Sequence, residues 1–200
     1  MMRKMLRIIL VIFVAGTLWS CYPEGPDYYD DYDVVYTNYD NNYVFTGKPK
    51  YAIPDKIIKI TGNMDAGKPP EYVPSTYSTQ MLNTMKANMA SLGYSLVDVS
   101  ANPDFVLMPS ALESTNVEYY YDYWGYYWGW YYPYPMTYTY KSGSLMMDLI
   151  DYKDISADGK RRVVWTGIVN GLLEGSSSEF TARMNKTIEQ AFRQSEYLRQ

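Results

Sequence analysis

The chain contains no histidine and only one cysteine among its 200 residues. Histidine is the usual general base and a common metal ligand near neutral pH, so its absence excludes Ser-His and Cys-His nucleophile pairs and most zinc sites. A single cysteine excludes a disulfide within the chain. The patterns G-x-S-x-G, G-x-x-x-x-G-K-S/T and H-E-x-x-H are also missing. We therefore expect no metal, no cofactor and no catalytic residue, and we predict that the protein is not an enzyme.

Positive charge is scarce as well. The chain has 18 basic and 22 acidic residues, for a formal net charge of −4 at pH 7. Three of the basic residues, Arg3, Lys4 and Arg7, stand in the first 20 residues, which contain no acid, so the remainder carries a net charge of −7. Because neutralisation of phosphates supplies most of the affinity of proteins for nucleic acid, we expect no nucleic-acid partner.

The N-terminus lacks an apolar run long enough to cross a membrane. Its apolar part is residues 8–18, whereas a spanning helix needs about 20 residues, so residues 1–20 are typical of a cleaved signal peptide. Leu18, Ser20 and Cys21 resemble the lipobox of bacterial lipoproteins, although Trp19 departs from the small residue usual before the last signal residue. The resemblance implies that Cys21 carries a diacylglycerol and a further acyl chain such as palmitate, which hold the protein on a membrane. An ordinary secretory signal is the alternative.

Residues 21–32 are predicted to form an acidic tether rich in tyrosine and proline. Pro23 and Pro26 disfavour helix and strand, and the mutual repulsion of Asp27, Asp30 and Asp31 keeps a chain extended. The segment is a solvated spacer, an export signal toward the outer face of the outer membrane, or a calcium site, although its aspartate spacing is not that of an EF-hand loop. We expect a cell-envelope protein held by lipid in the outer membrane, in either leaflet.

Residues 33–200 have the pattern of a single α+β domain. Short β-rich segments bounded by turn residues, and two longer segments with period-2 alternation, predict a twisted, mostly antiparallel sheet. The expected strands are residues 34–36, 43–45, 51–53, 57–60, 94–99, 105–111, 138–151 and 161–173. In the last strand we expect Val163, Trp165, Gly167 and Val169 to share a covered face, where glycine admits a helix or an aromatic ring.

Two helices are predicted to pack on one face of this sheet. The first, residues 76–92, has apolar side chains at helical spacing, with Ser75 or Ser78 as its cap and Gly93 just beyond its end. The second, residues 177–196, begins with a capping box of Ser176 and Glu179. Its apolar stripe consists of Phe180, Met184, Ile188, Ala191 and Phe192.

The order of several motifs resembles a family of bacterial envelope lipoproteins, the domain of unknown function 4136. The motifs are L-G-Y at 92–94, N-P-D-F-V-L at 102–107, S-G-S-L-M-M-D-L-I-D at 142–151 and V-V-W-T-G at 163–167. The likeness covers most of residues 33–197. It implies an α+β domain with a twisted, largely antiparallel sheet and helices on one face, and it implies no established activity, cofactor or catalytic residue.

An aromatic-rich loop is predicted at residues 119–137. It consists mostly of tyrosine and tryptophan, and its glycines and prolines disfavour regular structure. Aromatic surface stacks on sugars, enters lipid headgroups or contacts proteins, so Trp124, Trp128, Trp130 and Tyr131 are candidate ligand-binding residues for an envelope glycan or an envelope protein. The alternatives are that the stretch folds back over the sheet or is a low-complexity loop.

The acidic residues offer the other candidate site. Asp98, Asp104, Asp148 and Asp151 are scattered, and we expect them to be solvated or to cap turns. Asp148 and Asp151 are three apart in a strand, which places them on opposite faces. We therefore predict a lipid-anchored envelope protein with a non-enzymatic structural or binding role. The alternatives are a carboxylate-dependent glycan hydrolase and a glycan- or protein-binding module that uses the aromatic loop.

Overall fold

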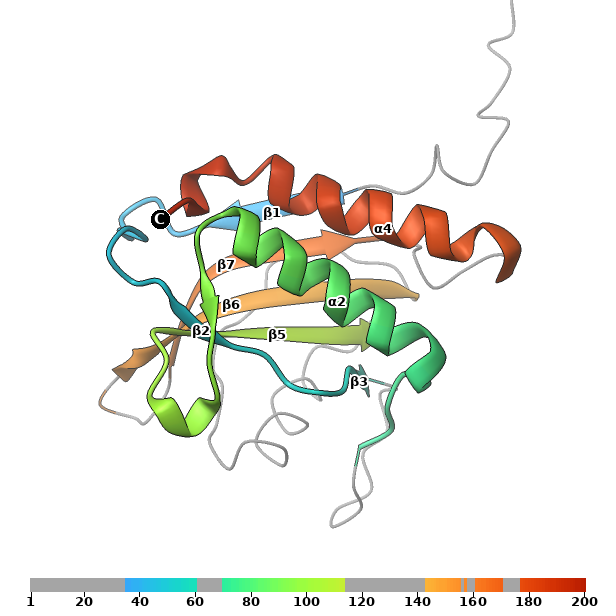
Figure 1. The fold of residues 1–200 in the computed structure, drawn as a ribbon, viewed down its shortest axis with the longest axis horizontal. Coiled ribbons are helices and arrows are strands. Elements are labelled where there is room, and N and C mark those ends of the chain that lie inside the picture. Colours follow the sequence, from blue (N-terminus) through green and yellow to red (C-terminus); the bar gives the residue numbers. More distant parts are fainter. Residues whose placement is uncertain (1–34, 61–69, 114–142, 156, 158–160, 171–176) are drawn as a thin grey trace, which may run out of the picture.

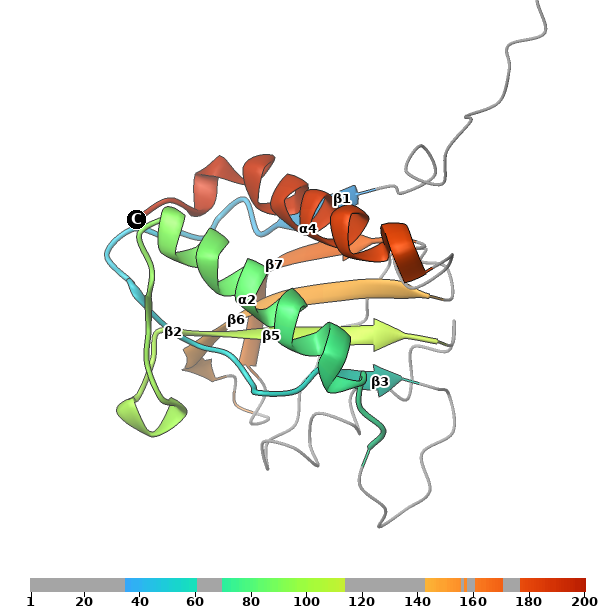
Figure 2. The ribbon, with the colours of Figure 1, turned by 45° about the vertical axis from the view of Figure 1, so that its right-hand side comes forward.

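In the part of the chain that the structure describes, two helices pack on one face of a seven-stranded mixed sheet, so the predicted α+β class is confirmed. The computed structural model describes residues 35–60, 70–113, 143–155, 157, 161–170 and 177–200. Cys21, the tether and the aromatic loop lie outside these residues. Figure 1 shows helices α2 (Ser75–Ser91) and α4 (Ser177–Arg193) side by side over the sheet, and the turned view of Figure 2 shows the same arrangement.

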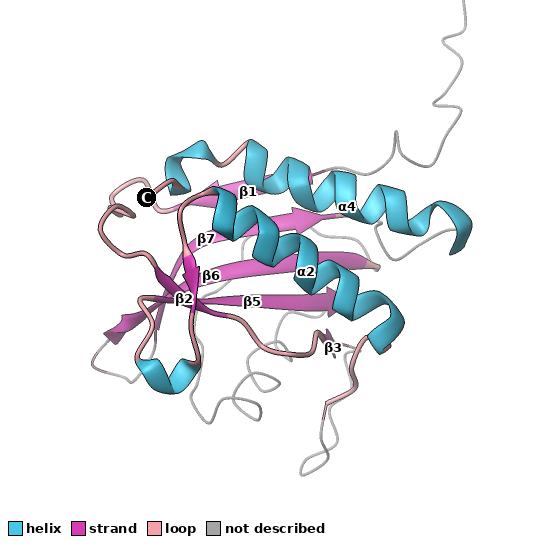
Figure 3. Ribbon diagram, viewed as in Figure 1, coloured by secondary structure: helices cyan, strands magenta, loops and turns pink. Residues whose placement is uncertain are grey.

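The sheet is built around three long strands, and its order is β1-β7-β6-β5-β2-β4, with β3 also beside β5. Neighbours among β1, β7, β6 and β5 pair antiparallel, whereas β2 and β3 pair parallel with β5, and β4 pairs parallel with β2. The mostly antiparallel sheet is thus confirmed (Figure 3). The strands are β1 (Val35–Tyr39), β2 (Lys50–Ala52), β3 (Ile58–Ile60), β4 (Ser95–Leu96), β5 (Phe105–Leu112), β6 (Ser144–Ile155) and β7 (Arg161–Val169).

Helix α2 ends where the sequence predicts but begins without a serine cap. Pro74 holds the N-cap position and no side chain caps the helix, so the prediction of Ser75 or Ser78 was wrong. Ser75 is already the first helical residue and Ser78 is buried. At the other end Gly93 has a φ of +95°, and the amides of Gly93 and Tyr94 donate to the carbonyls of Ala90 and Met89. This is a Schellman motif, which requires the left-handed conformation that glycine adopts readily.

Two predicted strands are shorter or absent because side chains compete for the backbone. Residues 43–45 form no strand, since the Asp40 carboxylate accepts from the Asn42 amide and the Asp40 carbonyl accepts from the Tyr43 amide, which turns the chain. Strand β4 ends after two residues, and the Asp98 carboxylate caps the 3₁₀ helix η2 (Val99–Ala101) by accepting from the Ser100 amide. Such local bonds offer the backbone an alternative to the sheet ladder.

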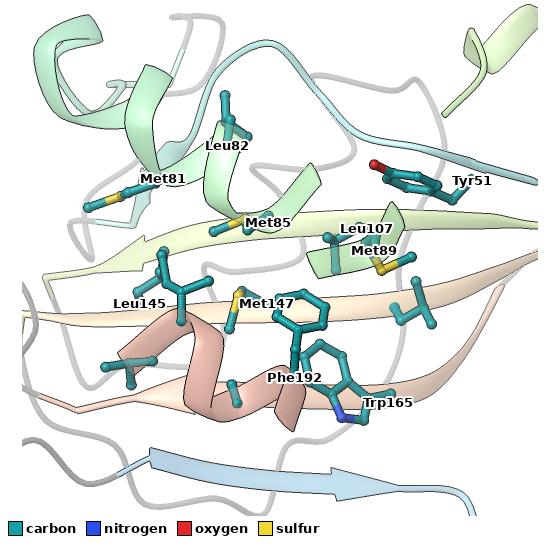
Figure 4. Packing of buried hydrophobic residues seen from close by; sticks show 14 of the residues in the cluster. Tyr51, Met81, Leu82, Met85, Met89, Leu107, Leu145, Met147, Trp165 and Phe192 are labelled. Atoms are coloured by element: carbon teal, nitrogen blue, oxygen red, sulfur yellow. The ribbon is translucent and has the colours of Figure 1, made fainter. Parts of the chain in front are cut away.

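The main core lies between the sheet and the two helices (Figure 4). Trp165 is buried beside Phe192, with ring centroids 5.4 Å apart, and its indole N–H donates to Ser195 Oγ at 3.0 Å. A Cβ on Gly167 would lie 2.7 Å from the Trp165 ring, so the glycine admits an aromatic ring of its own strand. The prediction that the Trp165 face is covered is therefore confirmed.

The predicted alternation in β7 was wrong at its start. Leu149 pairs with Trp165 and the next residue, Ile150, pairs with Val163, so the ladder shifts register between these pairs. Val164 is the extra residue of this bulge, which breaks the period-2 pattern. As a result Val164 joins Trp165 in the main core, while Val163 is only half-buried.

Candidate functional site

The five residues predicted from sequence as lipidation or ligand sites are outside the described residues. They are Cys21, Trp124, Trp128, Trp130 and Tyr131. The described residues on either side of the aromatic stretch lie close together. Gly143 donates its amide to the Leu112 carbonyl at 2.7 Å, and Leu112 pairs with Ser144 at the junction of β5 and β6.

The four candidate acids are dispersed. Asp98 is exposed and caps a turn as expected, and Asp104 accepts from the Lys50 amide and from Lys153 Nζ. Asp148 and Asp151 are both buried, so the expectation that they are solvated was wrong for this pair, although Asp151 accepts from the backbone amides two and three positions further on, as a turn-capping carboxylate does. The Asp148 carboxylate accepts from the Thr166 hydroxyl on the sheet face away from the helices. Asp151 points to the other face, so the structure does not bring these two carboxylates together.

Asp151 is the centre of a connected polar group. Its Oδ2 accepts from the Tyr43 hydroxyl and from Lys48 Nζ, the latter at 2.9 Å, and Lys48 Nζ also contacts the Tyr43 hydroxyl. Its Oδ1 accepts from the backbone amides of Lys153 and Asp154 at 2.9 and 3.0 Å. We call Tyr43, Lys48 and Asp151 the Asp151 cluster.

The Asp151 cluster is held by one strand and by one connection without regular secondary structure. Asp151 lies on β6 opposite Phe105, whereas Tyr43 and Lys48 come from the connection between β1 and β2. The Tyr43 ring rests against Phe45 and Phe105, with centroids 4.9 and 6.0 Å away, and Lys48 Nζ lies 4.3 Å from the Tyr43 centroid. Buried aromatic rings therefore hold the irregular connection where its polar groups reach the carboxylate.

Electrostatics keeps Asp151 charged and Tyr43 neutral. Burial acts to raise the pKa of Asp151, but the bonds from Tyr43, Lys48 and the two backbone amides outweigh it, and the pKa lies below its usual value. Burial, together with the Asp151 carboxylate, raises the pKa of Tyr43 far above its usual value. Near neutral pH the Tyr43 hydroxyl is thus protonated and donates to the Asp151 carboxylate.

Further ion pairs surround the cluster. The Arg162 guanidinium bonds to Asp40 and lies 3.6 Å from Asp154, and Lys153 Nζ lies 2.6 Å from Asp104. The backbone amide of Asn42 and the bond from Arg162 lower the pKa of Asp40. For Asp104, burial raises the pKa, but the Lys153 and Lys50 bonds outweigh it. At this end of the sheet, Asp40, Asp104 and Asp154 thus each lie beside a basic side chain.

Three further observations bear on what this domain can bind. A shallow hollow of about 280 Å³ lies between α2 and α4 and is lined by Ala87, Asn88, Ser91, Glu189 and Arg193. Within the described ranges, three or more Asp, Glu, His or Cys side chains never come together as metal ligands. None of the helices seen there has the length and apolarity that crossing a membrane requires.

Sequence reasoning named Asp151 but missed its partners. Tyr43 and Lys48 lie 108 and 103 positions away from Asp151 in the chain. Neither stands in a recognisable motif, and residues 43–45 were expected to be a strand. Only the packing of the connection between β1 and β2 against β5 and β6 brings these groups together.

Comparison with known proteins identifies the family of this chain. Residues 35–195 match the family described as "Domain of unknown function (DUF4136)". The crystal structure of a DUF4136 family protein from Bacteroides thetaiotaomicron VPI-5482 is 31% identical, with a TM-score of 0.67 over 84% of this chain and 97% of that one. A PelC dodecamer from Paraburkholderia phytofirmans is 16% identical with a TM-score of 0.39, over 84% and 98% of the two chains. No curated protein matches. The chain therefore belongs to the DUF4136 family.

Proposed function

We propose that this protein is held in the cell envelope by lipid on Cys21 and has a structural or binding role without catalysis. The observation that supports the anchor is the placement of Cys21 directly after Leu18-Trp19-Ser20 and the short apolar run. Strand β1 begins at Val35, 14 residues after Cys21. An extended chain spans at most about 3.5 Å per residue, so this tether keeps the domain within about 50 Å of the membrane surface.

Strand register orients the domain relative to this anchor. Val35 pairs with Val169, which pairs with Leu145, which pairs with Ala111. The tether and the aromatic stretch are thus attached at the same end of the sheet. The Asp151 cluster lies at the opposite end, where Asp151 pairs with Phe105, so we propose that it faces away from the membrane.

Metabolic labelling with an alkyne fatty acid tests the anchor. The unchanged chain should be labelled and recovered with membranes. Cys21→Ala should abolish labelling and release the protein, whereas Ser20→Ala, which keeps a small residue before the cysteine, should not. An unlabelled wild-type chain would end the lipoprotein proposal.

The observation that supports a non-catalytic role is the state of the carboxylates. A glycosidase needs one carboxylic acid whose raised pKa keeps it protonated, about 5–10 Å from a second carboxylate. The pKa values of Asp40, Asp104 and Asp151 are instead all lowered, each beside a basic side chain. The hydrolase alternative would regain support if the purified chain released soluble fragments from cell-wall glycan and Asp151→Asn, still folded, did not.

A further inference from the structure

The connection between β1 and β2 is attached to the domain mainly through side chains. Its two ends are fixed, because the amide of Asp40 and the carbonyl of Pro49 bond to backbone groups of β7 and β4. Between these ends, residues 41–48 make one backbone–backbone hydrogen bond within the described chain, from the Tyr43 amide to the Asp40 carbonyl. We call residues 41–48 the strap. Figures 1 and 2 show this connection beside the C-terminal residues.

Uncharged contacts hold the middle of the strap. The Phe45 ring is buried, and its centroid lies 6.3 Å from those of both Phe105 and Tyr197. The Gln200 side chain holds the strap backbone on both sides of this ring's residue and its turn. Its Nε2 donates to the Phe45 carbonyl and its Oε1 accepts from the Lys48 amide, each at 2.9 Å. Gln200 is therefore one attachment of the strap.

The Asp151 carboxylate is the other attachment. Its Oδ2 accepts from the Tyr43 hydroxyl and from Lys48 Nζ, both of which belong to the strap. Its Oδ1 accepts from the backbone amides of Lys153 and Asp154, which follow on the same strand, β6. Hydrogen bonds to a charged group are stronger than those between neutral groups. One buried carboxylate thus joins the strap to the sheet.

Movement of the strap would leave the rest of the described fold in place. Five of its eight residues are exposed, so it is the outermost part of the chain here. No hydrogen bond of a described strand ladder involves residues 41–48, and the bonds of Asp40 and Pro49 at its ends can remain. Segments with few backbone hydrogen bonds and high exposure are those that open locally in native proteins.

We propose that the strap opens as a unit about its ends at Asp40 and Pro49, with Asp151 and Gln200 as its two attachments. The closed strap covers the apolar rings of Phe105 and Tyr197. The open strap uncovers these rings and the Asp151 carboxylate while the sheet and helices stay folded. The open form is a minor conformation of the native domain. This proposal does not depend on a lipid anchor or on the absence of catalysis.

Hydrogen exchange of the Lys48 amide measures the opening, because this amide is bonded to the Gln200 side chain. The sample is the mature chain with Cys21→Ser, which prevents acylation. Tyr43→Phe keeps the ring but removes a hydrogen bond to a charged carboxylate, which changes an equilibrium by about tenfold. The Lys48 amide should therefore exchange about tenfold faster, while the amides of the ladder between β5 and β6 keep their rates.

Tyr39→Phe is the matched control for this measurement. Tyr39 lies shortly before the strap, and its hydroxyl makes no hydrogen bond within the described residues. Removal of this hydroxyl should leave all exchange rates unchanged. Acceleration of the Lys48 amide by Tyr39→Phe as large as that by Tyr43→Phe would contradict the role of Asp151.

Fluorine NMR tests whether the buried rings respond with the backbone. With 4-fluorophenylalanine, the mature chain carries four labelled rings: Phe45 on the strap, Phe105 beneath it, and Phe180 and Phe192 on α4 as internal controls. Gln200→Ala removes the uncharged attachment. Relaxation dispersion of the Phe45 and Phe105 signals should then increase several-fold, while the two signals from α4 stay unchanged.

Three results would overturn the strap. The first is an unchanged exchange rate of the Lys48 amide in Tyr43→Phe. The second is equal acceleration of this amide and of the amides between β5 and β6, because the strap would then open only when the whole domain unfolds. The third is relaxation dispersion in Gln200→Ala that is absent from Phe45 and Phe105 or shared equally by all four rings. If Gln200→Ala does not fold, the exchange rates in Tyr43→Phe decide.

Discussion

Trp165 shows how one side chain connects several parts of the core. Its ring lies across Gly167 of the same strand, packs on Phe192 of α4, and donates its indole N–H to Ser195 beyond the helix. The Ser195 hydroxyl in turn donates to the Ala191 carbonyl. The residue thus links β7 to the end of α4 through both apolar and polar contacts.

Replacement of this side chain should be costly. We expect Trp165→Ala to lower the free energy of unfolding by about 3–5 kcal/mol, the range for large core aromatics, because it leaves a cavity and removes the partner of Ser195. Urea unfolding followed by circular dichroism measures it. Leu96→Ala is the control, since Leu96 is 50% exposed and its loss should change stability by less than about 0.5 kcal/mol. A loss below about 1 kcal/mol for Trp165→Ala would contradict the core position.

Asp151 should make the stability depend on pH. Its pKa is lower in the folded chain than the usual value of 3.8, so folding stabilises the carboxylate. That contribution is complete above the usual value and is lost as the pH falls through the folded pKa, so stability should fall on acidification below about pH 5. Urea unfolding between pH 2.5 and 7, approximate limits that bracket the transition, measures the slope.

Two variants test whether Asp151 is the group whose protonation lowers the stability at acidic pH. Asp151→Asn should be less stable near neutral pH and should lose part of the acid dependence. Tyr43→Phe keeps the ring but removes a donor to the carboxylate, so the acid midpoint of Asp151 should move upward. An acid limb identical to wild type in both variants would show that this carboxylate is not the titrating group.

Helix α4 is held to the rest of the domain by one apolar stripe. Phe180, Met184, Ile188, Ala191 and Phe192 are all buried, as their spacing predicts. The Phe180 ring also meets Tyr77 of α2 edge-on, with centroids 4.9 Å apart, so the stripe connects the two helices as well as helix and sheet. Packing of this stripe is expected to supply most of the stability of the helix.

Truncation at the start of the stripe tests this docking. Phe180→Ala should lower the free energy of unfolding by about 3 kcal/mol, because a large buried ring is lost. Thr181→Ala, at an exposed neighbouring position, is the matched control and should have an effect within about 0.5 kcal/mol. Equal effects of the two substitutions would mean that α4 is not docked through Phe180.

At the scale of the whole molecule, the two ends of the sheet differ. One end carries the Asp151 cluster and its neighbouring ion pairs, and the other end carries the attachment points of the tether and of the aromatic stretch. The proposed membrane anchor and the aromatic stretch thus join the sheet at the same end. This separation makes the role of the aromatic residues the main functional question.

Replacing Trp124, Trp128 and Trp130 together by serine tests the role of the aromatic residues. If the stretch folds back over the sheet, one of the alternatives that the sequence leaves open, thermal and urea unfolding should show a loss of at least about 2 kcal/mol, since burial of one large apolar side chain contributes about 1.5–3 kcal/mol. Retention on purified cell-wall glycan or outer-membrane extract is measured on the same variant. A variant of unchanged stability that loses retention would identify a recognition surface instead.

The amino-acid sequence by itself determined the local elements and the class of the fold. Helix α4, the end of α2 at Gly93 and the covered position of Trp165 follow from apolar spacing and from glycine conformation, which depend on near neighbours only. The L-G-Y, N-P-D-F-V-L and V-V-W-T-G motifs were enough to suggest the DUF4136 family, which the comparison of residues 35–195 confirms. The targeting segment and Cys21 are equally local signals, and lipid attachment remains a prediction.

Tertiary structure alone decided which distant residues meet. Tyr43 and Lys48 reach Asp151 across more than 100 positions, and period-2 spacing says nothing about such a contact. The bulge at Val164 depends on the register that β6 imposes on β7. Burial of Met108, Asp148 and Ile168 on the sheet face turned away from the helices depends on what lies over the sheet, because strand alternation assigns a side chain to a face but does not specify whether that face meets water or protein.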